Sequence, residues 1–398
     1  MLFLLALSFS GYLELNRWIL VDDTLSFYPI FNTLRVEATT GQGDLYGLFS
    51  FDLRFYDVTG EMGARENLYP YDLSVYEAYF EVSDFLIENL DLKAGKQRIS
   101  WGTADKLNPT DNLNPDDLSN PINFGEHIPT EAVMLSYYVG DFSLTGVLLP
   151  IFHPALLPQD GIVTMPPGPV EYPEARPENM QYAVKFKGNL FNFDFSLSYF
   201  DGYDDFPYLA HVYVDTLQLP YLFSYSFSRE KVFGFDFAGE LFSVGLWGEV
   251  AYFIPDGVCT TWVDVSPIGP QYAASDTLPS YWKGTFGFDY SWHDLYINVQ
   301  YAHGLPFERK EEGRNLGDFV MGRLEYTLFD DKLKVALNGG VEMRDDSLGW
   351  MVSPSVEYHP TDNIQVEAGY FYGEGEGGTI FDRLEDFRGA ILRAKLSF

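Results

Sequence analysis

Hydrophobic and polar residues alternate along most of this chain. In residues 44–56 the odd positions are leucine, phenylalanine or glycine, whereas the even positions include Asp52 and Arg54. The same alternation recurs in residues 191–199 and 333–344. Because successive side chains of a β-strand point to opposite faces, this period of two predicts strands with one apolar and one polar face. The segments are about 9–13 residues long, which is the length that a tilted strand needs to cross a bilayer.

Short and long connections alternate between these segments. Outer-membrane barrels have short periplasmic turns and long extracellular loops, so the spacing predicts an all-β fold, a transmembrane antiparallel β-barrel of about 18 strands. Residues 208–227 could form a strand pair, but placing them inside an external loop keeps the strand number even and both termini periplasmic. The expected turns are 40–43, 139–141, 188–189, 239–240, 291–294, 329–332 and 359–363, and the expected loops are 58–70, 100–130, 151–178, 202–228, 255–280, 305–316 and 375–386.

Composition narrows the class of protein further. Aromatic residues make up 17% of the 398 residues and no linker-like break divides the chain, so we expect residues 11–398 to form a single barrel domain. The net charge of −33 argues against nucleic acid as a partner, because binding it requires a basic surface. The single cysteine, Cys259, excludes an intrachain disulfide and a cysteine-rich zinc site. No run of eighteen apolar residues occurs, so a membrane-spanning form must be a barrel.

The two ends of the sequence resemble signals for export and barrel assembly. Residues 1–10 are apolar and end in small residues, Ser8 and Ser10, which predicts the remnant of a secretory signal peptide, with a short buried strand as the alternative. Residues 388–398 alternate again and end in Phe398, which resembles the signal that the barrel-assembly machinery of Gram-negative bacteria recognises. We therefore expect an integral outer-membrane protein that contacts that machinery, lipid and lipopolysaccharide.

A further resemblance concerns the family. The run GKQRISWG at residues 95–102, followed by Leu107-Asn108-Pro109, resembles a porin-like outer-membrane family of undefined substrate that is distantly similar to alginate-export barrels. Residues 235–239 and 248–252 look like the central hairpin of that family. The resemblance implies an outer-membrane channel.

The strand alternation also assigns residues to the lumen. Charged groups on the lipid face cost about 2–4 kcal/mol for Arg or Lys at the midplane, so we expect them to line water or to pair with neighbours, for example Arg54 with Glu77 or Glu81, and Glu367 with Arg393 or Lys395. Loop 100–130 is the candidate for an inward-folding constriction, with an external loop as the alternative. The lumen and constriction candidates are Arg54, Glu77, Glu81, Gln97, Arg98, Trp101, Asp236, Glu249, Arg323, Glu325, Arg344, Glu367 and Arg393.

The candidates mix both signs of charge, with acids slightly ahead. An exporter of anionic polysaccharide would need a strongly positive channel, so the expected function is passive or weakly selective diffusion of small solutes with a slight cation preference. One alternative is a non-transport surface barrel acting as receptor, adhesin or scaffold. Another is a channel for hydrophobic compounds, with the apolar residues 148–157 as its access route or as a loop leaning on the bilayer rim. The lipid face shows no flattened patch of small residues, so we expect a monomer.

Catalytic and metal sites are not expected. The histidines of the predicted turns and loops have no serine partner at strand spacing, so we expect no enzyme. The loop acids Asp105, Asp111, Asp116 and Asp117 could bind Ca²⁺, but they lack the spacing of a calcium loop. We interpret them as solvated loop acids and expect no metal or cofactor.

Overall fold

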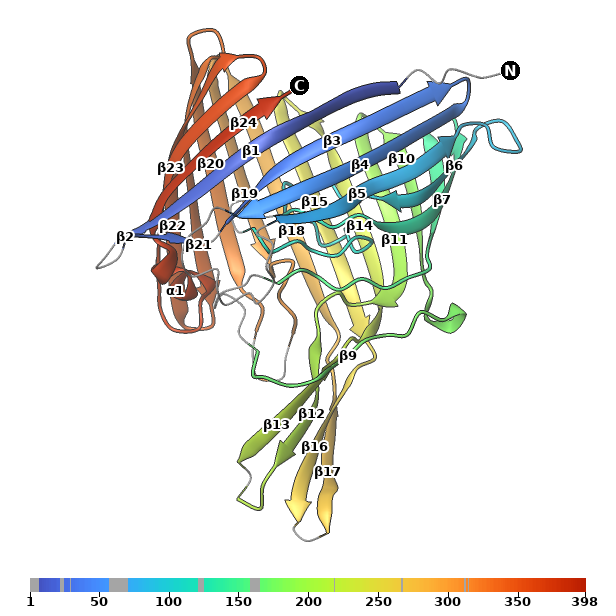
Figure 1. Ribbon diagram of the computed structural model, residues 1–398, viewed down its shortest axis with the longest axis vertical. Coiled ribbons are helices and arrows are strands. Elements are labelled where there is room, and N and C mark those ends of the chain that lie inside the picture. Colours follow the sequence, from blue (N-terminus) through green and yellow to red (C-terminus); the bar gives the residue numbers. More distant parts are fainter. Residues whose placement is uncertain are drawn as a thin grey trace.

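The computed structural model describes residues 7–21, 25–28, 30–56, 71–120, 125–157, 165–217, 219–265, 268–310, 313 and 315–398. The predicted loop 58–70 lies outside this part of the chain. Within the described residues, nineteen strands form one antiparallel sheet, in which β2 (Leu25–Tyr28) is a short strand beside the end of β1 (Figure 1). The other eighteen strands form the barrel wall. They are β1 (Leu7–Val21), β3 (Phe31–Gln42), β4 (Leu45–Tyr56), β5 (Tyr71–Val82), β6 (Leu90–Gln97), β7 (Thr130–Val139), β8 (Phe142–Leu149), β10 (Gln181–Leu190), β11 (Phe193–Tyr203), β14 (Arg229–Leu241), β15 (Val244–Pro255), β18 (Tyr281–Trp292), β19 (Leu295–His303), β20 (Asp318–Leu328), β21 (Leu333–Arg344), β22 (Ser347–Thr361), β23 (Ile364–Gly375) and β24 (Gly389–Ser397).

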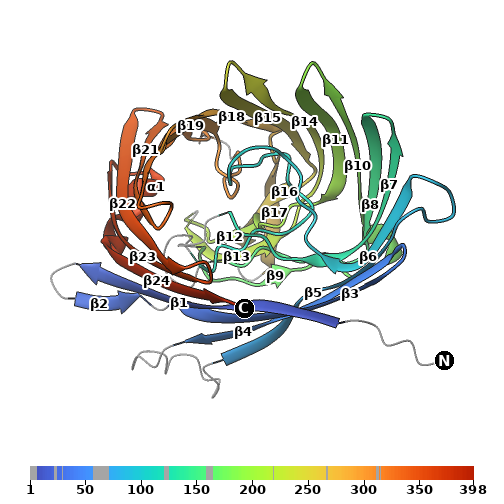
Figure 2. The same cartoon turned by 90° about the horizontal axis from the view of Figure 1, so that it is seen from above.

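The first and last wall strands close the barrel. β1 and β24 pair antiparallel from Tyr12 opposite Ser397 to Leu20 opposite Gly389. Figure 2 shows the resulting ring from above, and Figure 1 places the start of β1 and the end of β24 at the same end of the barrel. Closure leaves no open sheet edge in the wall, which is what a sheet in lipid requires. The predicted transmembrane barrel of about 18 strands is confirmed.

The two faces of the wall differ as the alternation predicts. On the outer face Phe49 and Phe233 are 48% and 50% exposed. Their inward-facing neighbours Ser50 and Asp236 are 0% and 3% exposed. A soluble protein would bury the phenylalanines, so this inverted distribution indicates an outer face that contacts lipid.

Two predicted turns, 188–189 and 239–240, are wrong. The chain reverses three residues later, at 191–192 and 242–243. All four turn residues have positive φ, as two-residue type I′ hairpins require, although none is glycine. The glycines that suggested the turns lie in strands instead. At Gly188 a Cβ would come within 2.5 Å of an aromatic ring on the neighbouring strand, so glycine there makes room for that ring.

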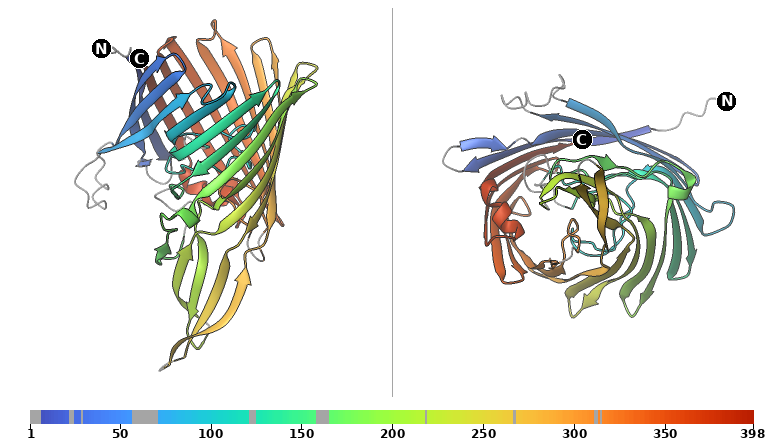
Figure 3. Two further views of the ribbon diagram at one scale, coloured as in Figure 1. Left: turned by 90° about the vertical axis from the view of Figure 1, so that its right-hand side faces the viewer. Right: turned by 90° about the horizontal axis from the view of Figure 1, so that it is seen from below.

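A second, smaller sheet lies beyond the loop end of the barrel (Figures 1 and 3). Residues 208–227 form a strand pair inside an external loop, which combines the two arrangements considered from the sequence. Residues 255–280, expected as a plain loop, contain a second hairpin, and the two hairpins join through parallel pairing. The order of this five-stranded sheet is β17 (Gly269–Thr277), β16 (Val258–Val265), β12 (Tyr208–Val214), β13 (Pro220–Ser226) and β9 (Val170–Glu171).

Other segments are short. Residues 7–10, expected at the end of a signal remnant, are the first residues of β1 and pair with β3. Residues 1–6 lie outside the described part. The described residues also contain α1 (Ile380–Arg383) and 3₁₀ turns at Pro177–Asn179 and Glu385–Phe387. None of the described helices has the length and apolar character to cross a membrane.

Gly95 provides a test of strand packing. It lies in β6 with φ +130°, and a Cβ there would come within 2.3 Å of the Ala78 carbonyl oxygen on β5. We expect Gly95→Ala to lower the free energy of unfolding by about 1–3 kcal/mol, because both the backbone conformation and the close approach oppose a side chain. Urea unfolding of the refolded protein in detergent measures this change. Gly339→Ala is the control, because nothing lies within 3.7 Å of its Cβ position. Equal urea midpoints for the two variants would contradict the prediction.

Candidate functional site

The loop between β6 and β7, residues 98–129, enters the barrel (Figure 2). Its residue Leu107 is 2% exposed and packs in one cluster with Ala302 and Phe319 of β19 and β20. The Thr285 hydroxyl of β18 donates to the Leu107 carbonyl oxygen at 2.8 Å. The loop therefore reaches from β6 to wall strands on another side of the lumen and fills part of it.

Glu249 of β15 anchors this loop. Its carboxylate accepts hydrogen bonds from the backbone N–H groups of Thr103, Ala104 and Thr110, the second at 2.5 Å and the third at 3.3 Å. It also accepts from the Asn108 amide at 2.9 Å and from the Thr110 hydroxyl at 2.8 Å. Hydrogen bonds to a charged acceptor are the strong ones, so one side chain of the central hairpin fixes about eight residues of loop.

The run at residues 95–102 starts the loop and shapes its path. Gly102 has φ +92°, and a Cβ there would come within 2.6 Å of a Glu249 carboxylate oxygen, so only glycine lets the backbone approach the anchor. The Arg98 guanidinium donates to Asp111 at 2.6 Å and to Asn114 at 3.1 Å. Arg98 therefore braces the loop from within.

The predicted pairing of Arg54 with Glu77 or Glu81 is wrong. Arg54 instead reaches the loop, where its Nη2 lies 3.2 Å from the Asp117 carboxylate. Glu77 accepts the backbone N–H of Arg98 at 2.8 Å. Glu81 lies opposite Lys93 in the β5–β6 pair. The correct partner of Arg54 is 63 positions away in sequence, so strand adjacency could not reveal it.

The remaining candidates line the wall or the root of the loop. Gln97 donates to the Ala132 carbonyl oxygen at 3.0 Å, and Trp101 is 6% exposed with the Lys185 Nζ 5.5 Å from its ring. The predicted pair of Glu367 and Arg393 is confirmed at 3.5 Å. Other candidates also form ion pairs on the inner face. These are Asp236 with Lys185 at 3.3 Å, Arg323 with Glu325 at 2.5 Å, and Arg344 with Glu342 at 3.0 Å and with Glu308.

The interpretation of the loop acids as solvated is wrong for three of the four. Asp111, Asp116 and Asp117 are each 7% exposed, and only Asp105 is exposed to solvent. Arg98 pairs with Asp111, and Arg54 pairs with Asp117. Burial of a charge requires such partners, so these acids are structural elements of the folded-in loop. Within the described residues, no group of three or more acidic, histidine or cysteine side chains could hold a metal ion.

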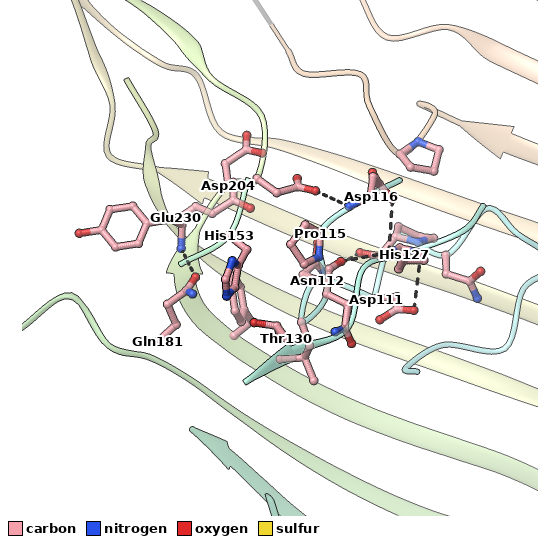
Figure 4. A pocket seen from close by; sticks show the side chains of 18 of the residues that line it. Asp111, Asn112, Pro115, Asp116, His127, Thr130, His153, Gln181, Asp204 and Glu230 are labelled. Carbon is pink, nitrogen blue, oxygen red and sulfur yellow. Dashed lines mark hydrogen bonds and ion pairs between the residues drawn. The ribbon is translucent and has the colours of Figure 1, made fainter. Parts of the chain in front are cut away.

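A cavity of about 50 Å³ lies between the loop and the wall (Figure 4). Its walls come from the loop, from the segment after β8, from β10, β11, β14, β15 and β18, and from residues 306–309. Carboxylates outnumber cations around it. The five acids are Asp111, Asp116, Asp204, Asp205 and Glu230, and the three basic residues are Lys106, Lys283 and Arg309.

Asp204, Asp205, Glu230 and Arg309 were not among the candidates from the sequence. Asp204, Asp205 and Arg309 lie in loops, where alternation gives no inside or outside. Glu230 opens β14 and shares the inward parity of Asp236, so the alternation could have identified it.

Burial raises the pKa values of two loop carboxyl groups that line the cavity. Burial raises the pKa of Asp205 to about 7, and the nearby charge of Asp116 adds to the effect. Burial likewise raises the pKa of Asp116 to about 6, against the lowering effect of Arg309. Asp116 and Asp205 are joined directly, because the backbone N–H of Asp116 donates to the Asp205 carboxylate at 2.8 Å. Both groups therefore change charge near neutral pH.

The apolar stretch 148–157 supports the same region. Leu149 is 2% exposed, and the backbone N–H of Ala155 donates to the Asp205 carbonyl oxygen at 3.0 Å. The backbone N–H of Leu156 donates to the Asp116 carbonyl oxygen at 2.9 Å. The end of this stretch therefore ties the inward loop to the loop after β11.

Comparison with known proteins places the chain in a family. A family model described as a protein of unknown function (DUF1302) matches residues 58–297. The chain belongs to this family. The match includes the run at 95–102 and both segments of the central hairpin. No curated protein matches the sequence of this DUF1302 member.

Two solved structures have a fold similar to that of this DUF1302 protein. OccK9 (OpdG) of Pseudomonas aeruginosa superposes with a TM-score of 0.57 at 11% identity, covering 98% of this chain and 97% of that one. Wzi of Escherichia coli superposes with a TM-score of 0.53 at 10% identity, covering 99% and 85%. The chain is a porin-like barrel integral to the outer membrane.

Removing the loop anchor tests the role of Glu249. We expect Glu249→Ala to speed hydrogen exchange of backbone amides in residues 103–110 at least tenfold, because each lost bond to a charged acceptor is worth about 1.5–3 kcal/mol. Mass spectrometry of peptides from this loop measures the exchange. Glu367→Ala is the control, because Glu367 pairs with Arg393 on the wall. Unchanged exchange in Glu249→Ala would show that packing alone holds the loop.

Proposed function

We propose that the protein is a porin-like channel through which small solutes diffuse passively, with a slight preference for cations. The observation that carries this proposal is the acidic cavity beside the folded-in loop, where five carboxylates face three basic side chains. Rings of acidic side chains favour cations in a water-filled pore. The loop narrows the lumen at that level, which favours small solutes over polymers.

The rest of the lumen supports weak rather than strong selectivity. Along the inner wall, cations are matched by acids in pairs such as Arg323 with Glu325 and Glu367 with Arg393. Paired charges leave little net field for a passing ion. A strongly positive track for an anionic polysaccharide is not present among the described residues. We propose no catalytic role. We propose that the protein is a monomer and that it contacts the barrel-assembly machinery and lipopolysaccharide.

Ion selectivity in a salt gradient tests the proposal. Above pH 7 both Asp116 and Asp205 are ionised, and below pH 6 both become neutral, because burial raises their pKa values to about 6 and about 7. We therefore expect the K⁺-to-Cl⁻ permeability ratio to exceed 1 at pH 8 and to fall about twofold or more by pH 5. Reversal potentials in planar bilayers measure this ratio.

The control is the double variant Asp116→Asn, Asp205→Asn. It keeps the other side chains that line the cavity, including His127 and His153, so only the two carboxylates differ. We expect its ratio at pH 8 to be lower and its pH dependence to be flatter than in the unmodified protein. Anion selectivity at pH 8, or absence of conductance, would overturn the proposed function.

The outer five-stranded sheet supports a second candidate, a surface receptor for carbohydrate. Tyr221, Tyr213, Trp262 and Tyr272 form a row of rings across it, with neighbouring centroids 6.5, 6.4 and 5.8 Å apart. Such rings offer flat apolar faces beside polar groups. Wzi, which shares the barrel fold at low identity, is described as a carbohydrate-binding β-barrel involved in capsule assembly.

Loss of the outer rings separates the two candidates. If the sheet binds neutral polysaccharide, Trp262→Ala with Tyr272→Ala should weaken that binding at least tenfold and leave single-channel conductance unchanged, because the sheet lies outside the barrel wall (Figure 3). Isothermal titration with a panel of neutral polysaccharides measures the binding. Equal affinity of both proteins, or no binding by either, would count against the receptor.

A further inference from the structure

Glu230 is a buried acid that lacks a hydrogen-bond partner. It lies on the inner face of β14, is 4% exposed and lines the cavity beside the folded-in loop. Among the described residues, no group donates to its Oε2 atom. A buried carboxylate oxygen without a donor is costly, so this atom is a position where a donor from outside the chain would be stabilised.

The two cations near Glu230 are engaged elsewhere. The Arg309 guanidinium donates two hydrogen bonds of 2.5 Å to Asp204 and another of 3.2 Å to Asp205. The Lys283 Nζ donates to the Pro306 carbonyl oxygen at 2.8 Å. Their charges act on Glu230 from a distance, but their N–H groups donate to other acceptors. Neither cation therefore supplies the donor that Oε2 lacks.

The charged groups around Glu230 also include more acids than bases. The charges of Arg309 and Lys283 favour the ionised form of Glu230, whereas those of Asp204 and Asp205 oppose it. Burial raises the pKa of Asp205, and the charge of Asp116 adds to the rise. A proton or a bound cation would relieve this shortage.

Aromatic rings complete the surroundings. Phe253 and Phe200 line the cavity together with Glu230. The Tyr281 ring stacks on Phe253 with centroids 4.9 Å apart, and its buried hydroxyl has no partner among the described residues. A carboxylate beside aromatic faces is the arrangement that binds ammonium groups. A cavity of about 50 Å³ has room for only a few heavy atoms.

We propose that this cavity binds the primary ammonium group of a small cationic solute, with the Glu230 carboxylate as its counter-charge and acceptor. The proposal rests on the proposed channel function and names the class of solute that pauses there. The ammonium donates to Oε2, whereas the Phe253 ring is already approached by the Lys283 Nζ, 5.3 Å from its centroid. Larger groups attached to the ammonium extend from the cavity into the lumen.

Methylammonium is the probe for the test, because it presents the ammonium and one further heavy atom. Two readouts are used on the purified full chain. The first is the shift of the thermal unfolding midpoint in detergent on addition of methylammonium chloride, compared with equal KCl. The second is the block of K⁺ current in planar bilayers. We expect both to saturate with methylammonium concentration in the unmodified protein, and tetramethylammonium, which has no N–H donor, to bind at least tenfold more weakly.

Variants locate the site. We expect Glu230→Gln to weaken methylammonium binding at least tenfold and Tyr281→Phe to weaken it about threefold. Glu325→Gln is the matched control, because this acid also faces the lumen but pairs with Arg323. Its binding should equal that of the unmodified protein. Should Glu230→Gln fail to fold, as judged by its mobility on unheated gels, Tyr281→Phe decides.

The outcomes separate the site from the channel. Absence of a saturable thermal shift in the unmodified protein overturns the site, whatever the conductance. So does equal binding by Glu230→Gln, or by Tyr281→Phe where that variant decides. A thermal shift that depends on Glu230 without any K⁺ current supports the site and contradicts the channel. K⁺ current without saturable methylammonium block or thermal shift supports the channel and contradicts the site.

Discussion

Backbone hydrogen bonding in lipid is the constraint on which this structure depends. Hydrocarbon offers no partner for an unpaired N–H or C=O group, so a sheet that crosses a membrane must close on itself. The pairing of β1 with β24 meets this requirement. Once the ring is closed, alternate side chains must face lipid and lumen, and this explains why phenylalanines are exposed while Asp236 and Glu249 are buried.

The lumen then requires partners for the charges directed into it. Some pairs form between or along wall strands, as Glu367 does with Arg393. Others involve the loop after β6, which supplies Asp117 for Arg54 and a set of donors for Glu249. The loop is thus held by inward-facing charges that would otherwise lack partners. The pairing of inward-facing charges therefore both stabilises the wall and holds the loop inside the lumen.

Much of the wall could be predicted from sequence, because a period of two is a local signal. The wrong turns at 188–189 and 239–240 show the limit of this signal. Gly188 makes room for an aromatic ring on the neighbouring strand, whereas the observed turn residues carry side chains at positive φ. Glu249 and Arg98 were among the expected lumen and constriction residues, but their contacts with the loop depend on where that loop returns in space. Contacts such as that of Arg309 with Asp204, 105 positions apart, leave no pattern in the sequence.

The loop acids link solution conditions to the position of the constriction. An acid whose pKa is raised by folding, as Asp205 is, stabilises the folded arrangement below its unfolded pKa and loses that contribution as pH rises through about 7. When both acids are charged, the hydrogen bond from the Asp116 backbone N–H to Asp205 strengthens but the two carboxylates repel each other, and this is the same state that favours cations in the cavity. A cation bound there supplies the positive charge that the proton supplied at lower pH. A cation at Glu230 and a proton on Asp205 each offset part of the negative charge of this cluster, so the binding of one weakens the binding of the other.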